Sequence, residues 1–313
     1  MLAFISPKQL RRQGVLGINQ RNTDYIMRYN PRHLYPLVDD KLTTKSLAIK
    51  AGIEVPRLYA TIEINHEINT LNSLLEQHTE FVIKPAHGSG GNGILVLGGR
   101  TGKFYKTASG NLITLDYIKH YVSNILSGMY SLGGLPDKAF LEYRVQFDPI
   151  FKKVSYKGVP DIRIIVFQGV PVCAMIRLPT SKSGGKANLH QGAIGVGINL
   201  STGHTTHAVV SNNSIGTHPD TGHTITDLQI PKWEKILEIA IKCADTVGLG
   251  YLGVDLVLDK TLGPLMLELN ARPGLNIQLA NQQGLLGKLR QIEQLNRIPR
   301  DPSERIALSK SLT

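Results

Sequence analysis

Short runs of apolar residues, many of them β-branched, recur along the chain between turn-forming residues. The runs with this pattern are 81–85, 94–99, 139–145, 161–169, 172–179, 251–259 and 263–270. Their length and composition are typical of β-strands, and the glycine, proline and polar residues between them are typical of turns. The pattern therefore predicts that short strands make up much of the fold.

Three segments carry helical signals instead. One begins near Pro231, ends at Gly248 and has an apolar stripe at helical spacing, formed by Trp233, Ile236, Leu237, Ala240, Ala244 and Val247. A second follows a candidate N-cap, Asp39 or Asp40, and ends at Gly52. A third helix is predicted over 115–126, within an otherwise polar and irregular stretch, 100–138.

Residues 180–230 are rich in Gly, Ser, Thr, Asn and His, which is typical of long functional loops rather than of a packed core. Five histidines fall in this segment: His190, His204, His207, His218 and His223. Their spacings match no zinc pattern, and no cysteine lies among them. We therefore interpret them as scattered loop histidines.

Composition is that of a soluble globular protein, with 42% hydrophobic and 19% charged residues. No apolar run approaches the roughly 18 residues of a membrane span, and the N-terminus does not have the pattern of a signal peptide. Cys173 and Cys243 lie in apolar stretches and are predicted to be buried thiols. These features favour a reducing, cytoplasmic location.

The formal net charge of +11 indicates either an anionic partner or a solvated basic surface. Nucleic acid is not expected, because aromatic residues make up only 6% of the chain and no nucleic-acid-binding module is visible. A cleft for polyanionic ligands, such as a nucleoside triphosphate or an acidic peptide, remains as an alternative to the solvated surface.

Two carboxylates are predicted to face each other near the C-terminal end of the chain. If 254–258 and 265–269 pair as a hairpin, Asp255 falls opposite Glu268, with Asn270 on the same face. Opposed like charges destabilise a strand pair unless a positive charge lies between them. Asp, Glu and Asn oxygens suit a hard cation such as Mg²⁺, although a solvent-exposed polar face explains the same residues at this stage.

The segment HGSGGNG, residues 87–93, lies between two predicted strands. It has neither the GK[ST] of a Walker A loop nor the following helix of a Rossmann fingerprint. Its backbone N–H groups could fold over phosphates, although a glycine-rich hairpin without a ligand is the alternative. Lys84 precedes it in the apolar strand FVIKP, where an ammonium group needs an anionic partner.

The motifs DDK, VIKP with its glycine loop, LEYRV, DIR, NLHQG, GVDLV and LELNARPG follow one another in this order over residues 39–285. With them the chain resembles the ATP-grasp superfamily, and within it the RimK-type glutamate ligases. The resemblance implies an α+β, ATP-grasp fold in which two α+β lobes hold ATP between antiparallel sheets. The expected division is a short N-terminal segment (1–38), an N-lobe with the glycine-rich loop and an insert (39–140), a C-lobe with the metal site (141–298) and a polar, frayed tail (299–313).

The resemblance also implies site residues, carried over by motif. The residues expected to bind the nucleotide are Lys41, Lys84, Ser89, Gly90, Gly91, Gly93, Glu142, Tyr143, Asp161, Lys186 and Asn188. Lysines 41, 84 and 186 and Asn188 would lie at the phosphates, residues 89–93 would close over them, Glu142 with Tyr143 would read the adenine, and Asp161 would lie at the ribose. Asp255, Glu268 and Asn270 would hold Mg²⁺, as two ions, with Mn²⁺ as an alternative.

Four residues are expected to act on the reacting groups: Arg163, Arg177, Asn188 and Arg272. Arg163 shares a strand face with Asp161, and Arg177 lies on the next strand, so both could orient a carboxylate or stabilise the transferring phosphoryl group. The alternative is a structural ion pair with a site acid. Arg272 stands in NARPG where RimK-type ligases commonly have NASPG, and its guanidinium suits a bidentate grip on a substrate anion.

The expected activity is an ATP-dependent carboxylate–amine ligase that works through an acyl-phosphate. It would add glutamate or another acidic amino acid to a peptide, protein or amino-sugar acceptor. The alternatives are a phosphotransferase or carboxylate-activating protein of cell-envelope assembly, or an inactive nucleotide-binding regulator. Only about 40 residues precede Lys41, where relatives usually carry a larger domain, so the acceptor-binding wall could come from a homo-oligomer, from the 100–138 insert or from the acceptor itself.

Overall fold

The structure is a computed structural model that describes residues 6–88 and 90–312. The chain forms two compact units. Unit 1 comprises the chain up to Asp39, Thr43–Glu54 and everything from Phe147 onward, whereas unit 2 comprises Asp40–Leu42 and Val55–Gln146. Among the described residues, no helix is both long enough and apolar enough to cross a membrane.

Unit 1 is built on a seven-stranded antiparallel sheet of order β11-β10-β9-β8-β7-β12-β13. Its strands are β7 (Asp161–Phe167), β8 (Val170–Leu178), β9 (Ile194–Ile198), β10 (Thr205–Val210), β11 (Asn213–Ile215), β12 (Tyr251–Asp259) and β13 (Gly263–Asn270). The four strands predicted from apolar runs are confirmed. The interpretation of 180–230 as loops is wrong for β9–β11, which extend the sheet from β8.

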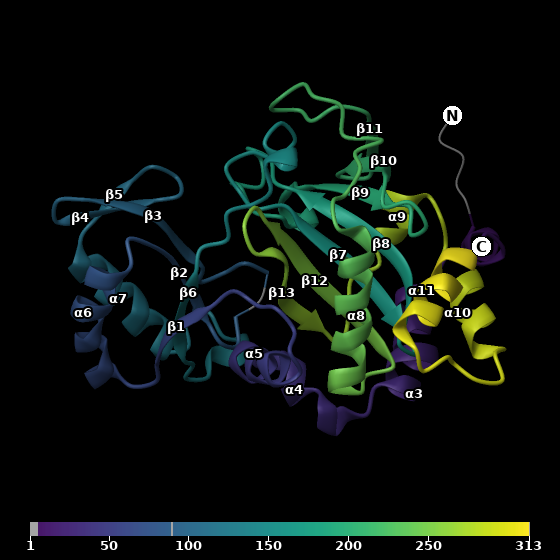
Figure 1. Ribbon diagram of the computed structural model, residues 1–313, viewed down its shortest axis with the longest axis horizontal. Coiled ribbons are helices and arrows are strands. Elements are labelled where there is room, and N and C mark those ends of the chain that lie inside the picture. The colour runs from purple at the N-terminus through teal and green to yellow at the C-terminus, as the bar shows by residue number, and fades with distance from the viewer. Residues whose placement is uncertain (1–5, 89, 313) are drawn as a thin grey trace. The chain divides into compact units, whose positions relative to one another are not determined.

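Helix α8 (Trp233–Val247) packs on β7, β8, β12 and β13, as Figure 1 shows, and it confirms the predicted amphipathic helix. Helix α11 (Pro302–Ser311) forms where a frayed tail was expected. The guanidinium of Arg305 holds this helix to α8, because its Nη1 and Nη2 atoms donate to Asp245 of α8 at 2.7 and 2.9 Å. The buried thiols of Cys173 and Cys243 also confirm the prediction.

The N-terminal segment is part of the unit 1 core rather than an appendage. It consists of α1 (Pro7–Arg12), α2 (Ile18–Gln20), a π-helix (Arg21–Ile26), α3 (Met27–Tyr29), a 3₁₀ turn (Arg32–Leu34) and α4 (Pro36–Asp39). The rings of Tyr25 and Tyr29 meet that of Phe167 edge-on, with centroids 5.5 and 4.9 Å away. Helices α9 (Ile277–Asn281) and α10 (Leu286–Glu293) contribute to the same apolar cluster.

A single buried side chain ties this segment to the ends of two strands. The Asn30 carboxamide accepts from the Tyr251 N–H at 2.8 Å and donates to the carbonyls of Tyr251 and Ala271 at 2.7 and 3.0 Å. Asn30 is 2% exposed, so these bonds are shielded from water. These hydrogen bonds hold Tyr251, the first residue of β12, next to Ala271, the residue that follows β13.

Unit 2 contains a six-stranded antiparallel sheet of order β1-β6-β2-β3-β4-β5. Its strands are β1 (Leu58–Ile62), β2 (Glu80–Pro85), β3 (Leu95–Thr101), β4 (Phe104–Thr107), β5 (Leu112–Ile113) and β6 (Ala139–Tyr143). Helices α6 (Leu71–Gln77) and α7 (Leu115–Leu126) supply Leu71, Leu75, Ile118 and Val122 to its core. Helix α7 has the predicted bounds, and the surrounding insert also contains the β4–β5 hairpin. Helix α5 (Lys41–Lys50) is the third predicted helix. Its first two residues are assigned to unit 2 and the others to unit 1.

Replacing Asn30 with Ala should lower the free energy of unfolding by about 2–3 kcal/mol, because it leaves one buried N–H and two buried carbonyls without their partner. Urea unfolding followed by circular dichroism measures this effect. Asn213→Ala, at an exposed position of β11, is the matched control and should change stability by less than about 0.5 kcal/mol. Equal effects of the two substitutions would contradict the role given to Asn30.

Candidate functional site

The largest group of predicted site residues in unit 1 meets on one face of β7, β8 and β12. Asp255 pairs in register with Arg163 across β12 and β7, and Asp161 pairs with Arg177 across β7 and β8. Residues two apart on a strand share a face, so all four side chains lie on the same side. The same face continues into Ile165, Phe167 and Tyr251, which pack in the core with the N-terminal segment. The charged cluster therefore begins where that apolar core ends.

The four side chains form a continuous ion-pair network. Arg163 grips Asp255 with two donors, the Nε at 2.7 Å from Oδ1 and an Nη2 contact to Oδ2. Arg177 pairs with Asp161 through Nε and Nη2, and its Nη2 also donates to Asp255 Oδ2 at 2.8 Å. The structural ion pair that the sequence left as the alternative for the two arginines is thus present.

Burial and neighbouring charge act in opposite directions on these groups. Burial alone would raise the pKa of Asp255, but the guanidinium groups of Arg163 and Arg177 outweigh it and lower the pKa to about 2. Burial raises the pKa of Asp161 to about 6 against the attraction of Arg177, and the Asp255 charge adds to the increase. Burial opposes the charge of Arg177, yet both carboxylates raise its pKa. Asp255 therefore remains an anion at neutral pH.

The predicted metal ligands are brought together by β12 and β13. Asp255 lies opposite Glu268 as expected, and the Asn270 amide nitrogen is 3.3 Å from Asp255 Oδ2. The hairpin differs from a simple ladder, because its register shifts between Asp255 and Leu256. This bulge leaves one extra residue, Leu267, on β13 between the partners of Asp255 and Leu256.

Oxygen donors of this kind fit Mg²⁺ in chemical type. Within 6–88 and 90–312, no group of three or more His, Cys, Asp and Glu side chains is placed to hold a metal. A site at β12–β13 would thus rest on Asp255, Glu268 and the amide oxygen of Asn270, completed by oxygens from outside the protein, as is usual for Mg²⁺. Asp255 would share its oxygens between such a metal and the two arginines.

In unit 2, the predicted nucleotide-binding residues gather around β2 and β6. Lys84 on β2 forms an ion pair with Glu142 on β6, which supplies the anionic partner expected for this lysine. The side chains are 15% and 4% exposed, so the pair is nearly desolvated. Lys41 donates to the carbonyl of Gly88 at the start of the glycine loop, and Tyr143 ends β6.

Three glycines of the glycine loop have backbone conformations that other residues rarely adopt. Gly90, Gly91 and Gly93 have φ of 64°, 77° and 73°, in the left-handed region. A Cβ on Gly93 would also lie 2.6 Å from the Tyr130 ring. Ser89, predicted to belong to the closing loop, lies outside the described residues.

Lys186 and Asn188 lie in the segment between β8 and β9, within unit 1. The Asn188 side chain accepts from the His190 N–H at 3.0 Å and caps a 3₁₀ turn (Leu189–Gln191), while Lys186 is exposed. His218 in the following segment is fully buried, and its Nε2 lies 2.9 Å from the Pro179 carbonyl.

Arg272 is held by residues that the sequence analysis did not single out. Its guanidinium carbon lies 4.8 Å from the centre of the Tyr35 ring, and the neighbouring Pro273 carbonyl accepts from Arg21 Nη1 at 2.9 Å. The Asn30 carboxamide also donates to the Ala271 carbonyl. Three contacts from the N-terminal segment thus hold residues 271–273. No motif or periodicity in that segment indicates these contacts, because they join residues more than 200 positions apart.

Asp255→Asn should destabilise unit 1 by about 3–5 kcal/mol at pH 7, because it leaves two nearly buried guanidinium groups without a full counter-charge. Since folding lowers the pKa of Asp255 from 3.8 to about 2, its ionic contribution is present in full above pH 4 and is lost as the pH falls towards 2. Denaturant unfolding of both proteins between pH 2.5 and 7 should show the difference shrinking at the acid end. A difference that is constant over this range would contradict the ionic network.

Comparison with solved structures finds distant similarities. The ATP-grasp ligase PsnB, in complex with a minimal precursor, is 15% identical over 90% of this chain, with a TM-score of 0.45. The L-amino acid ligase from Bacillus licheniformis is 12% identical over 90% of this chain and 48% of its own, with a TM-score of 0.46. This chain spans 63% of the length of PsnB. At these scores the similarities carry no argument about activity, and no curated protein matches the sequence.

A family model described as sugar-transfer associated ATP-grasp matches residues 20–294. The match extends over both sheets and includes the β7–β8–β12–β13 cluster, the glycine loop and Arg272. The RimK type expected from the motifs is not specified by this match, whereas the expected superfamily and α+β fold are confirmed. The chain belongs to the sugar-transfer associated ATP-grasp family.

Proposed function

We propose that this protein is an ATP-dependent ligase that joins a carboxylate to an amine through an acyl-phosphate. One observation carries the proposal. The β12–β13 pair brings Asp255, Glu268 and Asn270 together. Two residues after Asn270 comes Arg272, whose guanidinium packs on the Tyr35 ring. A set of hard oxygen donors beside an oriented guanidinium suits a reaction between a polyphosphate and a carboxylate.

In the first step, a carboxylate oxygen of the substrate attacks the γ-phosphorus of ATP, and ADP leaves. Lys41, Lys84 and the backbone N–H groups of the glycine loop are proposed to bind the phosphates, where the charges of the lysines and the dipoles of the N–H groups favour the transition state. Magnesium, held by Asp255, Glu268 and Asn270, would neutralise charge on phosphate oxygens when bound. Arg272 is proposed to hold the attacking carboxylate by two parallel hydrogen bonds.

In the second step, the amine attacks the carbonyl carbon of the acyl-phosphate, and inorganic phosphate leaves. The amine must lose a proton in forming the amide. Exclusion of water is needed at this stage, since water would hydrolyse the intermediate. Arg163 and Arg177 are proposed to act by holding Asp255 and Asp161 in place, because the Nε and Nη2 atoms of both arginines donate to these carboxylates. This differs from the direct role on substrate that the sequence first favoured.

The family description bears on the acceptor. Among the peptide, protein and amino-sugar acceptors expected from the sequence, its association with sugar transfer favours an amino sugar. Glutamate as the carboxylate remains a prediction from the motif resemblance. Arg272 supports a carboxylate substrate, because its guanidinium can hold a carboxylate by two parallel hydrogen bonds.

A second candidate is activation of a carboxylate, or phosphoryl transfer, within a sugar-transfer pathway without amide formation. The family description favours this candidate as well. The mass of the product separates the two, because ligation joins both substrates with loss of water whereas phosphorylation adds only a phosphoryl group.

The purified protein should release ADP when it receives ATP, Mg²⁺, L-glutamate and an amino sugar, and mass spectrometry should detect the amide. Glu268→Gln should reduce this turnover by about a hundredfold or more, since a metal ligand supplies several kcal/mol of charge stabilisation. Its far-ultraviolet circular dichroism and melting temperature should stay close to those of the parent protein. Undiminished turnover in the variant would remove the metal assignment. No ADP release with any pair of a wider panel of carboxylates and amines would count against the ligase itself.

Arg272→Ser should raise the KM of the carboxylate substrate by about ten- to a hundredfold, because a bidentate charge-assisted contact is lost. The KM of ATP should remain nearly unchanged. Tyr35→Leu should reproduce part of the effect by removing the ring under the guanidinium, whereas Tyr35→Phe keeps the ring and is the control. A change confined to the KM of ATP would show that Arg272 serves the nucleotide instead.

A further inference from the structure

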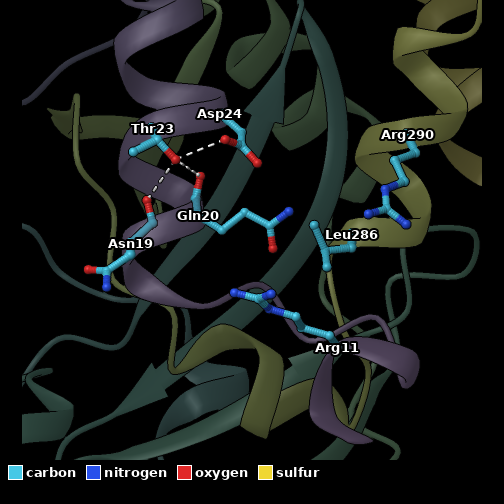
Figure 2. Close-up of a pocket in the computed structure, with 7 residues that line it drawn as sticks. All are labelled: Arg11, Asn19, Gln20, Thr23, Asp24, Leu286 and Arg290. Atoms are coloured by element: carbon cyan, nitrogen blue, oxygen red, sulfur yellow. Dashed lines mark hydrogen bonds between the residues drawn. The ribbon is translucent and has the colours of Figure 1, made fainter. Parts of the chain in front are cut away.

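A second polar pocket lies in unit 1, among residues that the candidate active site does not use. It has a volume of about 360 Å³, which falls within the range of small-ligand pockets. Figure 2 shows the residues that line it, which are Arg11, Asn19, Gln20, Thr23, Asp24, Leu286 and Arg290. None of these seven residues, all of them described by the structure, belongs to the predicted nucleotide, metal or reacting-group sets.

The pocket is formed where the N-terminal segment meets helix α10. The Leu286 N–H donates to the Gly14 carbonyl at 3.0 Å, which fixes α10 beside the end of α1. Gly284 has to be glycine here, because a Cβ would lie 2.0 Å from the Gly14 oxygen. The opposite wall is α2 and the π-helix, in which the Met27 N–H reaches back five residues to the Asn22 carbonyl. Such wide helical turns are frequent at functional sites.

Two guanidinium groups give the pocket its charge. Arg11 and Arg290 are exposed, and among the described residues neither forms an ion pair or a side-chain hydrogen bond. In Figure 2 they extend from either side of Leu286, and the Gln20 carboxamide points between them. The pocket lining thus contains two guanidinium groups, each with five N–H donors, together with the single carboxylate of Asp24.

The remaining polar groups require a ligand that also donates hydrogen bonds. The Oε1 atom of Gln20 is buried and, in the described part of the chain, has no hydrogen-bond partner. A buried acceptor in this state costs about 1–3 kcal/mol unless a donor reaches it. Asp24 contributes carboxylate oxygens, one of which accepts from Thr23 Oγ1 at 2.8 Å.

We propose that this pocket binds a small phosphorylated polyol, of the sugar-phosphate class. A carboxylate has two coplanar oxygens that one guanidinium can saturate, whereas the tetrahedral oxygens of a phosphate can accept from two guanidinium groups at once. Several hydroxyls would supply donors to Gln20, Asn19 and Asp24, and Leu286 would contact the C–H face of the ring. A nucleotide suits the pocket less well, because none of its seven described lining residues is aromatic and able to stack on a base.

Calorimetric titration of the full-length protein with α-D-glucose 1-phosphate tests the proposal. Saturable one-to-one binding is expected, weakened about tenfold or more by Arg11→Ala with Arg290→Ala. Gln20→Leu should also weaken it, since the leucine cannot accept a hydroxyl. Arg12→Ala with Lys288→Ala is the matched control, because it removes the same charge from the same two helices outside the pocket, at an exposed and a half-buried position respectively.

Three results would overturn the assignment. Equal weakening by the control pair would show that net charge alone attracts the ligand. Equal affinity for inorganic phosphate and for the sugar phosphate would show that the hydroxyls are not recognised. Binding of L-glutamate or glucose in preference to the sugar phosphate would assign the pocket to another class. ADP release by the Arg11→Ala, Arg290→Ala protein should match the parent, so failure here leaves the proposed ligase reaction untouched.

Discussion

The network of Arg163, Arg177, Asp161 and Asp255 is the interaction on which the candidate site depends. A β-sheet places side chains of neighbouring strands about 5 Å apart, so carboxylates facing one another repel unless positive charge is interposed. The two guanidinium groups supply that charge and leave the four-residue cluster with no net charge. Glu268 adds a further carboxylate at this end of the sheet, opposite Asp255, where oxygen donors suit a divalent cation.

The short N-terminal segment supports both the sheet of unit 1 and the residues that follow β13. It packs Tyr25 and Tyr29 against the sheet and holds residues 271–273 through Arg21, Asn30 and Tyr35. The chain directly after the β13 ligands is thus supported from a segment over 200 residues away in sequence. The same π-helix that carries Arg21 also lines the second pocket through Thr23 and Asp24, so one short element serves both places.

The sequence predicted β7, β8, β12 and β13 because their apolar runs fill both faces of a buried sheet. It missed β9, whose glycines are typical of loops. Gly195 and Gly197 are required for packing instead, since a Cβ on Gly197 would lie 2.5 Å from the Ala280 carbonyl. Within the site, Asp255 opposite Glu268 was predictable because a short hairpin joins them. The Arg163–Asp255 pair joins strands 92 residues apart, and local sequence holds no signal for such a register.

Arg272 shows why the motifs predict the fold better than they predict the substrate. The carboxylates, lysines and glycines are proposed to serve the phosphoryl-transfer step, which is the same for any carboxylate substrate. A guanidinium on the end of a flexible side chain is useful for selection only if it is held in place, and the guanidinium carbon of Arg272 lies over the Tyr35 ring, 4.8 Å from its centre. With serine at position 272 the ring would have nothing to orient. The proposed substrate contact therefore depends on a pair of residues, Tyr35 and Arg272, from two distant segments of the chain.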